Sequence, residues 1–558
     1  MKSKLKNINS KLFLFIMSLF VSFLCILPGL MPEMYVGKDF AFHVYRIQEM
    51  ASNIVRDGVY FPSLQANNIF GYGYLIDIFY PNLFLYPAAF LTILIKNPLT
   101  ALKILIFIYT IFTFYLSYFS AKLTTTHEKF PLYFAIFYCL YPYRILDLYC
   151  NGFMGEFFSY SFLPLVIFGM HRLFKENKWK MLAIGMIGIV YSHLITLLLA
   201  TIYIGIYSII NIKSIVKDFK IALNLLKATI TTMLVGSAFL LPLISYMESD
   251  TYKYNKNADL SGIVAYGLFD LPIVIEVLIF TVFTFMAFYA YKDLKKKFDS
   301  KELLISLIVM VYSMLMMTKT FPWELLDYIP FLRNIQFSIR IFNLVSPFMV
   351  FIFVYFALCL KDMNKVFFFF FTSCILTLMV TTKYEIKQSG EEITNYDIEY
   401  ANVKGYQAGT YFEILGGEYV PLSLSINNLD LYDITDDILL KYNKPEFSNN
   451  VLDYELIKDG SLTTTLIVET KENVDVTLPL IYYQNYKAYL EGEELEIYEK
   501  DGRVSIKDIT SGTIIIRFEV SDLQKMSFVI SLLTLIMFGI YEIKIYLKKC
   551  LQNINKMV

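Results

Sequence analysis

The sequence predicts a polytopic α-helical membrane protein with about twelve transmembrane helices and a small, mostly β domain before the last helix. Three observations predict this fold class. Of the 558 residues, 56% are hydrophobic and only 18% are charged, which is more apolar than a soluble globule requires. Runs of about 20 uncharged residues, the length that crosses a bilayer, recur along the chain. Residues 382–525 hold 13 Lys and Arg against 27 Asp and Glu, whereas the rest holds 36 against 22.

The predicted crossings are the long apolar segments between short polar connections. They lie at 12–30, 100–121, 130–145, 156–173, 181–192, 194–210, 221–244, 271–291, 302–318, 341–360, 365–381 and 526–547. The basic start MKSKLKNINSK is typical of a signal peptide, but no small-residue cleavage site follows it. We therefore expect the first segment to be a retained helix.

The short basic connections predict the orientation. Lys and Arg cluster at 171–180, 211–220 and 291–301 and in the C-terminal tail, which twelve crossings place on one side, the cytoplasmic side by the positive-inside rule. We expect a multi-pass protein of the cell membrane, with both termini cytoplasmic and residues 382–525 extracytoplasmic. Whether the segment 80–96 crosses the membrane decides on which side all later connections lie. This segment is short and contains two prolines, so we interpret it as a re-entrant or interfacial helix.

The predicted domains follow from these segments. Residues 1–381 form a transmembrane domain, whose outer loop 31–99 carries amphipathic or re-entrant helices. Residues 382–525 form a β-rich domain, and 526–558 form the last helix with a basic tail. In the β-rich domain, TTTLIVETK, VDVTLPLIYY, EELEIYE, RVSIKDI and TIIIRFEV read as strands and KDG (500–502) as a hairpin turn, which predicts a small β-sandwich. The six cysteines form no CxxC pair, and a disulfide framework or zinc site is not indicated.

Ionisable residues near membrane depth gather in the outer segments, and such residues are functional-site candidates because they are costly there. In GKDFAFHVYRI (37–47), Asp39 and His43 are spaced i, i+4 and share a helix face, with Arg46 close by. Asp39 is either a carboxylate that accepts a proton or holds a metal, or the N-cap of an amphipathic helix.

Two further segments place single ionisable residues in apolar surroundings. Glu156 lies in NGFMGEFFSYSF at the start of an apolar segment, where Arg144 and Asp147 precede it. It forms either a structural ion pair or part of a substrate site. His193 in IVYSHLITLL is either a satisfied polar core residue or a donor to a phosphate oxygen.

A third segment, FLRNIQFSIRIF, repeats polar residues at three- and four-residue spacing. Arg333, Gln336 and Arg340 would lie on one helical stripe. Arginines bind phosphate groups by paired hydrogen bonds. The alternative is that these side chains extend to the membrane interface.

The order of these motifs resembles the YfhO-type bacterial membrane proteins, a group also described as related to 6-pyruvoyl-tetrahydropterin synthase. The resemblance spans most of the chain. In order, the matching stretches are GKDFAFHVYRI, YFPSLQANNIFGYGYLIDIFYPNLFLYP, YPYRILDLYCNGFMGEFFSYSFLPLVIFG, YSHL, RNIQFSIRIF, GGEYVPLSL and LPLIYYQNYKAYLEGEELEIYEKDGRVSI.

The resemblance implies a GT-C-fold glycosyltransferase. Such an enzyme takes a sugar from a polyprenyl-phosphate donor outside the cytoplasmic membrane and passes it to a cell-envelope glycan or protein. It implies that Asp39 is the acid of the first outer loop and that Glu156, with Asp147, is the acid of the second. Three residues are candidates for the donor phosphate: His193, Arg333 and Arg340.

Asp39 and Glu156 are thus the catalytic candidates. The substrate-binding candidates are His43, Arg46, Arg144, Asp147, His193, Arg333, Gln336 and Arg340. The sequence requires no cofactor, although a divalent metal is compatible with the acids. The expected partners are the lipid-linked donor, the envelope acceptor and membrane lipid, and no nucleic acid. Two other functions fit a polytopic chain: a transporter or flippase of a lipid-linked glycan, and a non-catalytic partner of a glycosyltransferase.

Overall fold

The structure is a computed structural model of the chain. It describes residues 2–30, 34–36, 38–61, 63–248, 251–252, 321–326, 328–335, 337–358, 391–393, 418–424, 444–458 and 460–554, with 308, 311–312, 315–316 and 371. Three predicted spans, 271–291, 302–318 and 365–381, therefore lie wholly or mostly outside the described residues, as does the basic segment 291–301.

Helices dominate the described part of the chain. They are α1 (Lys2–Ile26), α2 (Lys38–Asp57), α3 (Asn68–Gly71), α4 (Ile76–Phe79), α5 (Tyr86–Ile95), α6 (Pro98–Lys122), α7 (Phe130–Cys139), α8 (Pro142–Leu146), α9 (Met154–Tyr160), α10 (Leu163–Glu176), α11 (Lys180–Val190), α12 (Leu194–Ile210), α13 (Ile212–Lys217), α14 (Lys220–Met247), α17 (Ile341–Ala357) and α22 (Asp522–Ile554). Short turns of other helix types are η1 (Leu27–Leu30), η2 (Leu83–Leu85), η5 (Trp323–Leu326), η6 (Pro330–Ile335), η7 (Ser338–Arg340) and the π-helical η3 (Asp147–Asn151).

Six described helical segments are long and apolar enough to cross a membrane, as expected for a multi-pass membrane protein. They are Ser10–Leu30, Pro98–Lys122, Met154–Glu176, Lys220–Met247, Ser338–Tyr355 and Asp522–Lys544. Each coincides with a predicted span. At the other three predicted spans in the described part, 130–145, 181–192 and 194–210, the helices are shorter, with 10 residues in α7, 11 in α11 and 17 in α12.

Proline explains one of these short elements, and a further helix, α5, is also too short to span a bilayer. The predicted span 130–145 is interrupted because Pro142 begins α8, and the preceding Tyr141 is extended at φ −60° and ψ 129°, as a residue before proline prefers. The segment 80–96 forms α5, which has 10 residues and is therefore about 15 Å long. That is half the thickness of a bilayer core, so α5 is too short to cross on its own.

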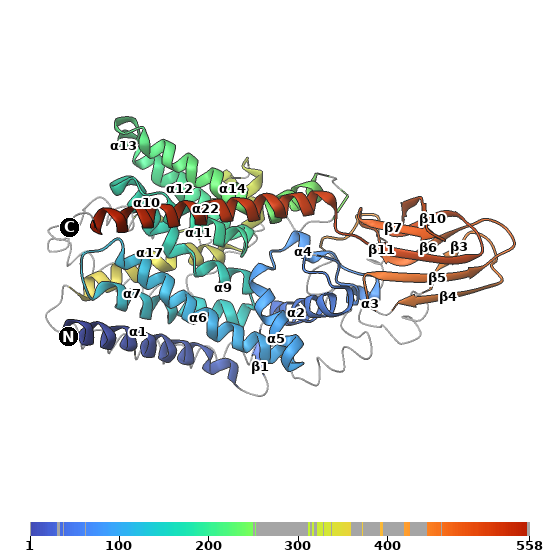
Figure 1. Ribbon diagram of the computed structural model, residues 1–558, viewed down its shortest axis with the longest axis horizontal. Coiled ribbons are helices and arrows are strands. Elements are labelled where there is room, and N and C mark those ends of the chain that lie inside the picture. The colour runs from blue at the N-terminus through green and yellow to red at the C-terminus, as the bar shows by residue number, and fades with distance from the viewer. Residues whose placement is uncertain are drawn as a thin grey trace.

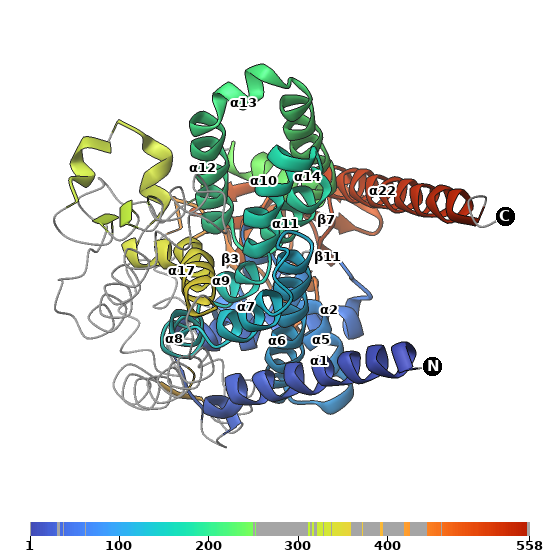
Figure 2. The same ribbon diagram turned by 90° about the vertical axis from the view of Figure 1, so that its left-hand side faces the viewer.

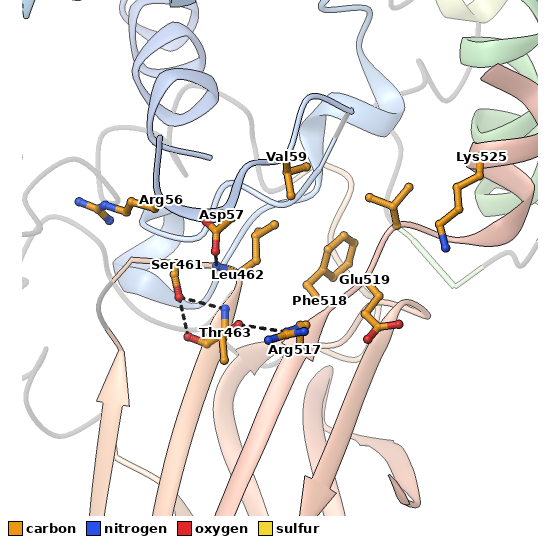
Figure 3. Close-up of a pocket in the computed structure, with 11 residues that line it drawn as sticks. Arg56, Asp57, Val59, Ser461, Leu462, Thr463, Arg517, Phe518, Glu519 and Lys525 are labelled. Atoms are coloured by element: carbon orange, nitrogen blue, oxygen red, sulfur yellow. Dashed lines mark hydrogen bonds between the residues drawn. The ribbon is translucent and has the colours of Figure 1, made fainter. Parts of the chain in front are cut away.

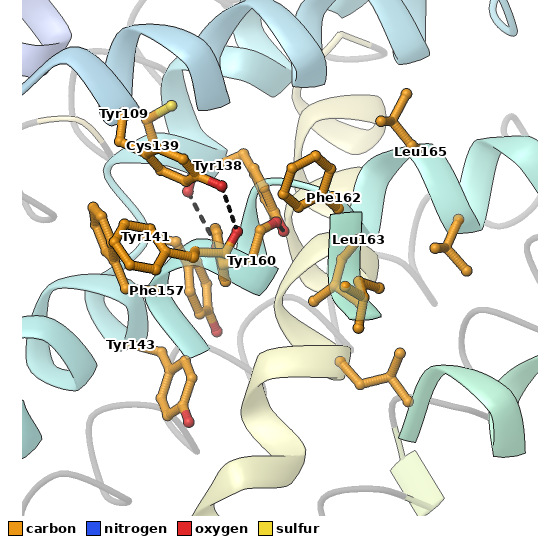
Figure 4. Close-up of a cluster of buried hydrophobic side chains, with 14 of the residues drawn as sticks. Tyr109, Tyr138, Cys139, Tyr141, Tyr143, Phe157, Tyr160, Phe162, Leu163 and Leu165 are labelled. Carbon is orange, nitrogen blue, oxygen red and sulfur yellow. Dashed lines mark hydrogen bonds between the residues drawn. The ribbon is translucent and has the colours of Figure 1, made fainter. Parts of the chain in front are cut away.

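Two tyrosines provide hydrogen-bond donors for the C-terminal ends of α7 and α9 (Figure 4). The hydroxyl of Tyr138, near the end of α7, donates to the carbonyl of Tyr160 at 2.6 Å, and the hydroxyl of Tyr160 donates back to the carbonyl of Tyr138 at 3.1 Å. Their rings stack with centroids 4.1 Å apart. The last carbonyls of a helix have no partner within the helix, and here phenols supply it.

Within the described part of the predicted β-rich domain, residues 446–518 form a sandwich of two antiparallel sheets, as predicted. Its strands are β3 (Glu446–Phe447), β4 (Asp453–Lys458), β5 (Thr463–Glu469), β6 (Val474–Ile481), β7 (Tyr486–Leu490), β8 (Glu493–Leu495), β9 (Ile497–Lys500), β10 (Arg503–Ile509) and β11 (Gly512–Phe518). The sheet orders are β3-β6-β10-β9 and β4-β5-β11-β7-β8. The KDG turn joins β9 to β10 with Asp501 and Gly502 at φ 51° and 75°, the left-handed conformation of a tight hairpin.

The sandwich lies at one end of the helical bundle, and the two ends of the chain lie at the other end (Figure 1). Between them lie α2, α3 and α4. The amide of Ile481 donates to the carbonyl of Tyr72 at 2.9 Å, which joins the sandwich to this outer layer. Seen from the end with the termini, α6, α7 and α9 are central while α1 and α22 are peripheral (Figure 2). A two-stranded sheet pairs β1 (Met34–Val36) with β2 (Glu391–Ile393).

Candidate functional site

A buried ion pair joins the two membrane segments that carry Glu156 and Arg340. Arg340 Nε lies 2.9 Å from Glu156 Oε1, and the side chains are 9% and 1% exposed. The hydroxyl of Tyr143 donates to the other carboxylate oxygen at 3.0 Å. The guanidinium carbon lies 4.9 Å from the ring of Phe153 and 5.2 Å from that of Phe337. Contacts on several sides therefore fix the orientation of Arg340.

Two more acids complete a cluster around this arginine. Asp39 is the second residue of α2 and lies within electrostatic range of Arg340, as does Asp147. Burial raises the pKa of Asp39 to about 6, against the opposing charge of Arg340. Burial, and then the charge of Glu156, raise the pKa of Asp147 well above its usual value. Asp147 Oδ1 accepts no hydrogen bond among the described residues. Three carboxylates thus share the charge of one arginine.

The ring of Tyr80 lies beside this cluster, although the sequence analysis did not select it. Its centroid is 5.6 Å from that of His43 and 6.3 Å from that of His193. It fits because position 155 is glycine: a Cβ there would collide with the Tyr80 hydroxyl and lie 3.1 Å from the Ser192 carbonyl oxygen. Because Gly155 has no side chain, the Tyr80 hydroxyl can pack against the backbone of α9 immediately before Glu156.

Arg46 holds the turn that carries Tyr80. Its Nε and Nη2 donate to Asp77 Oδ1 at 3.1 and 2.9 Å, and Nη2 also donates to the carbonyls of Tyr80 at 2.8 Å and Pro81 at 3.2 Å. Both members of the ion pair are buried. The structure thus directs Arg46 toward Asp77, a residue that sequence reasoning missed. A single acid in the apolar stretch LIDIF (75–79) was the available signal.

His43 lies one turn after Asp39 on the same face of α2, as predicted. It is buried, and its Nδ1 has no hydrogen-bond partner in the described part of the chain. Burial lowers its pKa, and the charges of Arg46 and His193 lower it further. His43 is therefore neutral at pH 7.

His193 caps the N-terminus of α12 and joins a buried polar network. Its Nδ1 accepts from the amide of Thr196 at 3.3 Å and lies 2.9 Å from the Thr196 hydroxyl oxygen. The amide of Asn343 donates to that hydroxyl at 3.0 Å and to the hydroxyl of Ser159 at 3.2 Å. Because Nδ1 accepts from a backbone amide, we assign the proton of the neutral ring to Nε2. Asn343 was missed, although it follows Arg340 at helical spacing.

Arg144 is buried but faces the helical bundle instead of Glu156. Its Nη2 donates to the Thr110 hydroxyl at 3.0 Å and its Nη1 to the Cys139 carbonyl at 3.3 Å. The guanidinium carbon lies 4.4 Å from the ring of Phe157. These contacts are structural, and the structure does not bring Arg144 into the cluster.

The prediction of one helical stripe through Arg333, Gln336 and Arg340 is wrong. Arg333 belongs to η6 and Arg340 to η7, and between them Phe337 is extended at φ −129° and ψ 130°. Arg333 is half-buried, and Gln336 lies outside the described residues.

Asp39 is not the N-cap that one interpretation suggested, because it lies inside the first turn of α2. Among the described residues, no group of three His, Cys, Asp or Glu side chains is arranged to hold a metal ion.

The similarity of the chain to known proteins is low. No family model matches it. Over 260 residues, 44% of this chain, it is 25% identical to an uncharacterised protein of Lactococcus lactis subsp. cremoris (strain MG1363). The aligned part is 42% of that protein, so the chain is similar to it over less than half of either length.

Proposed function

We propose that the chain is a GT-C-type glycosyltransferase with twelve membrane crossings. It would transfer a sugar from a polyprenyl-phosphate donor to a cell-envelope acceptor on the outer face of the cytoplasmic membrane. One observation carries the proposal: Glu156 pairs with Arg340, and the carboxylates of Asp39 and Asp147, from two other segments, lie within electrostatic range of the same arginine. Glu156 and Arg340 each lie in the first turn of a membrane segment, at the depth where a lipid-linked sugar would present its reacting carbon.

The opposite end of the bundle supports the proposed orientation. There the predicted cytoplasmic segments meet: Asn177 Nδ2 donates to Asp218 Oδ2 at 2.9 Å, and Lys180 pairs with Glu542. These contacts join the connections 171–180 and 211–220 to the last helix. Basic residues of short connections favour the cytoplasmic side, which leaves the acidic cluster on the outer side.

In the proposed reaction, Asp39 is the base. With a pKa of about 6, most Asp39 side chains are ionised at pH 7 and can accept a proton from an acceptor hydroxyl. The acceptor oxygen forms a bond to the anomeric carbon as the bond from that carbon to the donor phosphate oxygen breaks. The electron pair leaves with the polyprenyl phosphate, the proton passes to Asp39, and the configuration at the anomeric carbon inverts.

The other residues would orient the donor. Arg340, aligned by Glu156, and the Nε2–H of His193 are the proposed donors to the phosphate, together with Arg333. Such fixed donors stabilise negative charge that develops on a leaving group. Tyr80 would close one side of the site.

Replacing Asp39 with asparagine tests the proposal. In membranes supplied with a radiolabelled polyprenyl-phosphate sugar, we expect transfer to fall by about 10²- to 10⁴-fold, the usual contribution of a general base. Asp218→Asn, at the opposite end of the bundle, is the matched control and should leave transfer unchanged. Undiminished transfer by normally expressed Asp39→Asn would reject the role of Asp39.

Purified protein separates the three functions considered. A transferase releases polyprenyl phosphate from the donor in detergent, without a partner protein. Movement of the intact donor across liposomes without its breakdown would instead identify a transporter. Donor breakdown that needs a second protein would identify a non-catalytic partner.

A further inference from the structure

A hollow of about 940 Å³ lies where the end of α2, the five-stranded sheet and the start of α22 meet (Figure 3). Cations from three elements line it: Arg56 in the last turn of α2, Arg517 on β11 and Lys525 in the first turn of α22. Two acids, Asp57 and Glu519, also line it. The hollow is large enough for a small ligand or a lipid headgroup.

Both acids of the hollow have partners of their own. Asp57 Oδ1 accepts from the backbone amide of Leu462 at 3.2 Å, which joins α2 to the sandwich. Glu519 lies within electrostatic range of Lys487, which is outside the hollow. Among the cations, Arg517 donates from Nε to the Thr463 hydroxyl at 3.3 Å. Lys525 pairs with Asp522 at 3.0 Å, but this pair is exposed and of the kind that contributes little. Three cations thus line the hollow against two acids, although residues 382–525 hold 27 acids against 13 bases.

The hollow lies at the surface of the membrane. Lys525 is 58% exposed and stands at the start of a candidate span. Immediately after it, Met526 is 64% exposed, as expected of a side chain that faces lipid. Phe61 packs on Phe528 of α22 with ring centroids 5.0 Å apart, and aromatic residues are typical of the interface between membrane and water. The cations therefore lie at the depth of lipid headgroups.

The apolar surface continues down α22 from this point. Its side chains Val529, Leu533 and Ile536 are 51%, 55% and 47% exposed and recur at helical spacing. A lipid whose phosphate reaches Lys525 and Arg517 can thus lay its acyl chains along this helix. A soluble anion has no acyl chain that could pack against this apolar surface.

We propose that the hollow binds the phosphate headgroup of an anionic phospholipid, between Arg517 and Lys525, with the acyl chains along α22. The bound lipid would tie the sandwich to the membrane beside its last helix. Guanidinium groups suit phosphate because they donate paired hydrogen bonds, and the ammonium of Lys525 adds charge at the membrane surface. The site is about 25 Å along α2 from Asp39, because 17 residues separate Arg56 from it in that helix. It is therefore distinct from the acidic cluster.

The test uses the full chain purified in detergent and a fluorescent short-chain phosphatidylglycerol, with binding followed by anisotropy. Replacing both Arg517 and Lys525 with glutamine should weaken binding by about 10- to 30-fold, from about 1 kcal/mol for each cation near a lipid surface. Lys525→Gln alone removes an exposed side chain and should give part of that loss. Lys507→Gln, which changes an exposed lysine on β10 of the other sheet, is the matched control and should stay within about twofold of the unmodified chain.

Two competitors identify the ligand. Unlabelled phosphatidylglycerol should displace the probe. Phosphatidylcholine, whose headgroup has no net charge, should need concentrations about 10-fold higher, and inorganic phosphate, which has no acyl chains, concentrations at least about 100-fold higher. Equal affinity in the double variant would overturn the site. Displacement by inorganic phosphate as effective as that by the lipid would overturn the assignment to a phospholipid. Binding does not require sugar transfer, so Asp39→Asn should bind the probe normally whether or not the chain is a transferase.

Discussion

Replacing Arg340 with glutamine removes the cation that pairs with Glu156 at 2.9 Å. Both side chains are less than a tenth exposed, so the variant leaves a buried carboxylate without its ion-pair partner. Loss of one member of a buried ion pair costs about 3–5 kcal/mol. We expect the free energy of unfolding to fall by that amount at pH 8.

The loss should shrink as the pH falls. Burial raises the pKa of Asp39 to about 6 while Arg340 opposes the shift, so without Arg340 the pKa of Asp39 rises further. A raised carboxyl pKa means that the folded state binds more protons than the unfolded state, and stability then increases on acidification. The difference between Arg340→Gln and the unmodified chain should therefore be largest at pH 8 and smallest near pH 5.

The measurement is denaturant unfolding in detergent, followed by the fluorescence of Trp179 and Trp323. Arg172→Gln is the matched control, because Arg172 pairs with Glu176 at 3.1 Å one turn away on the helix surface. Such a pair contributes about 0.3–0.5 kcal/mol. If the free energy of unfolding at pH 8 falls by the same small amount in both variants, the ion pair between Arg340 and Glu156 does not stabilise the fold and the reasoning fails.

Three further predictions concern the surroundings of the cluster and the sandwich. Gly155→Ala should cost about 1–3 kcal/mol of unfolding free energy, because its Cβ collides with the Tyr80 hydroxyl; adding Tyr80→Phe should recover part of the loss in the same unfolding assay. Asp77→Asn should cost about 3–5 kcal/mol by leaving Arg46 buried without a counter-charge, and an unchanged unfolding midpoint would contradict this. Burial lowers the pKa of Lys458 to about 7, so the unfolded state binds more protons between pH 7 and the usual lysine pKa, and stability should rise with pH there. Lys458→Met should abolish that rise in unfolding measured at pH 7 and 9.

The sequence was most informative where a short local pattern decides the structure. In the sandwich, β5 alternates buried and exposed residues, and the Asp501–Gly502 pair fits a tight turn, so strands and turn could be read from neighbouring residues. Segments of about 20 mostly apolar residues likewise stand out as spans. The break before Pro142 was missed because hydropathy does not register a change of backbone conformation.

The site was harder to predict because its contacts join distant parts of the chain. A single acid or arginine at membrane depth indicates that a partner is needed, and this led to Glu156 and Arg340. No spacing rule identifies the partner 184 positions away (340 minus 156), or directs Arg46 toward Asp77. The role of Tyr80 could not be predicted for the same reason, because the position of its ring depends on the absence of a side chain at the distant Gly155.

The reciprocal pair of Tyr138 and Tyr160 has a consequence for permeability. Helix breaks in a bilayer commonly admit water, because open carbonyls need donors. Here the two phenols meet that need, and their rings and those of Phe134 and Phe157 are buried. The carbonyls of Tyr138 and Tyr160 therefore need no water molecule as a hydrogen-bond donor, and we expect the ends of α7 and α9 to stay dry within the membrane.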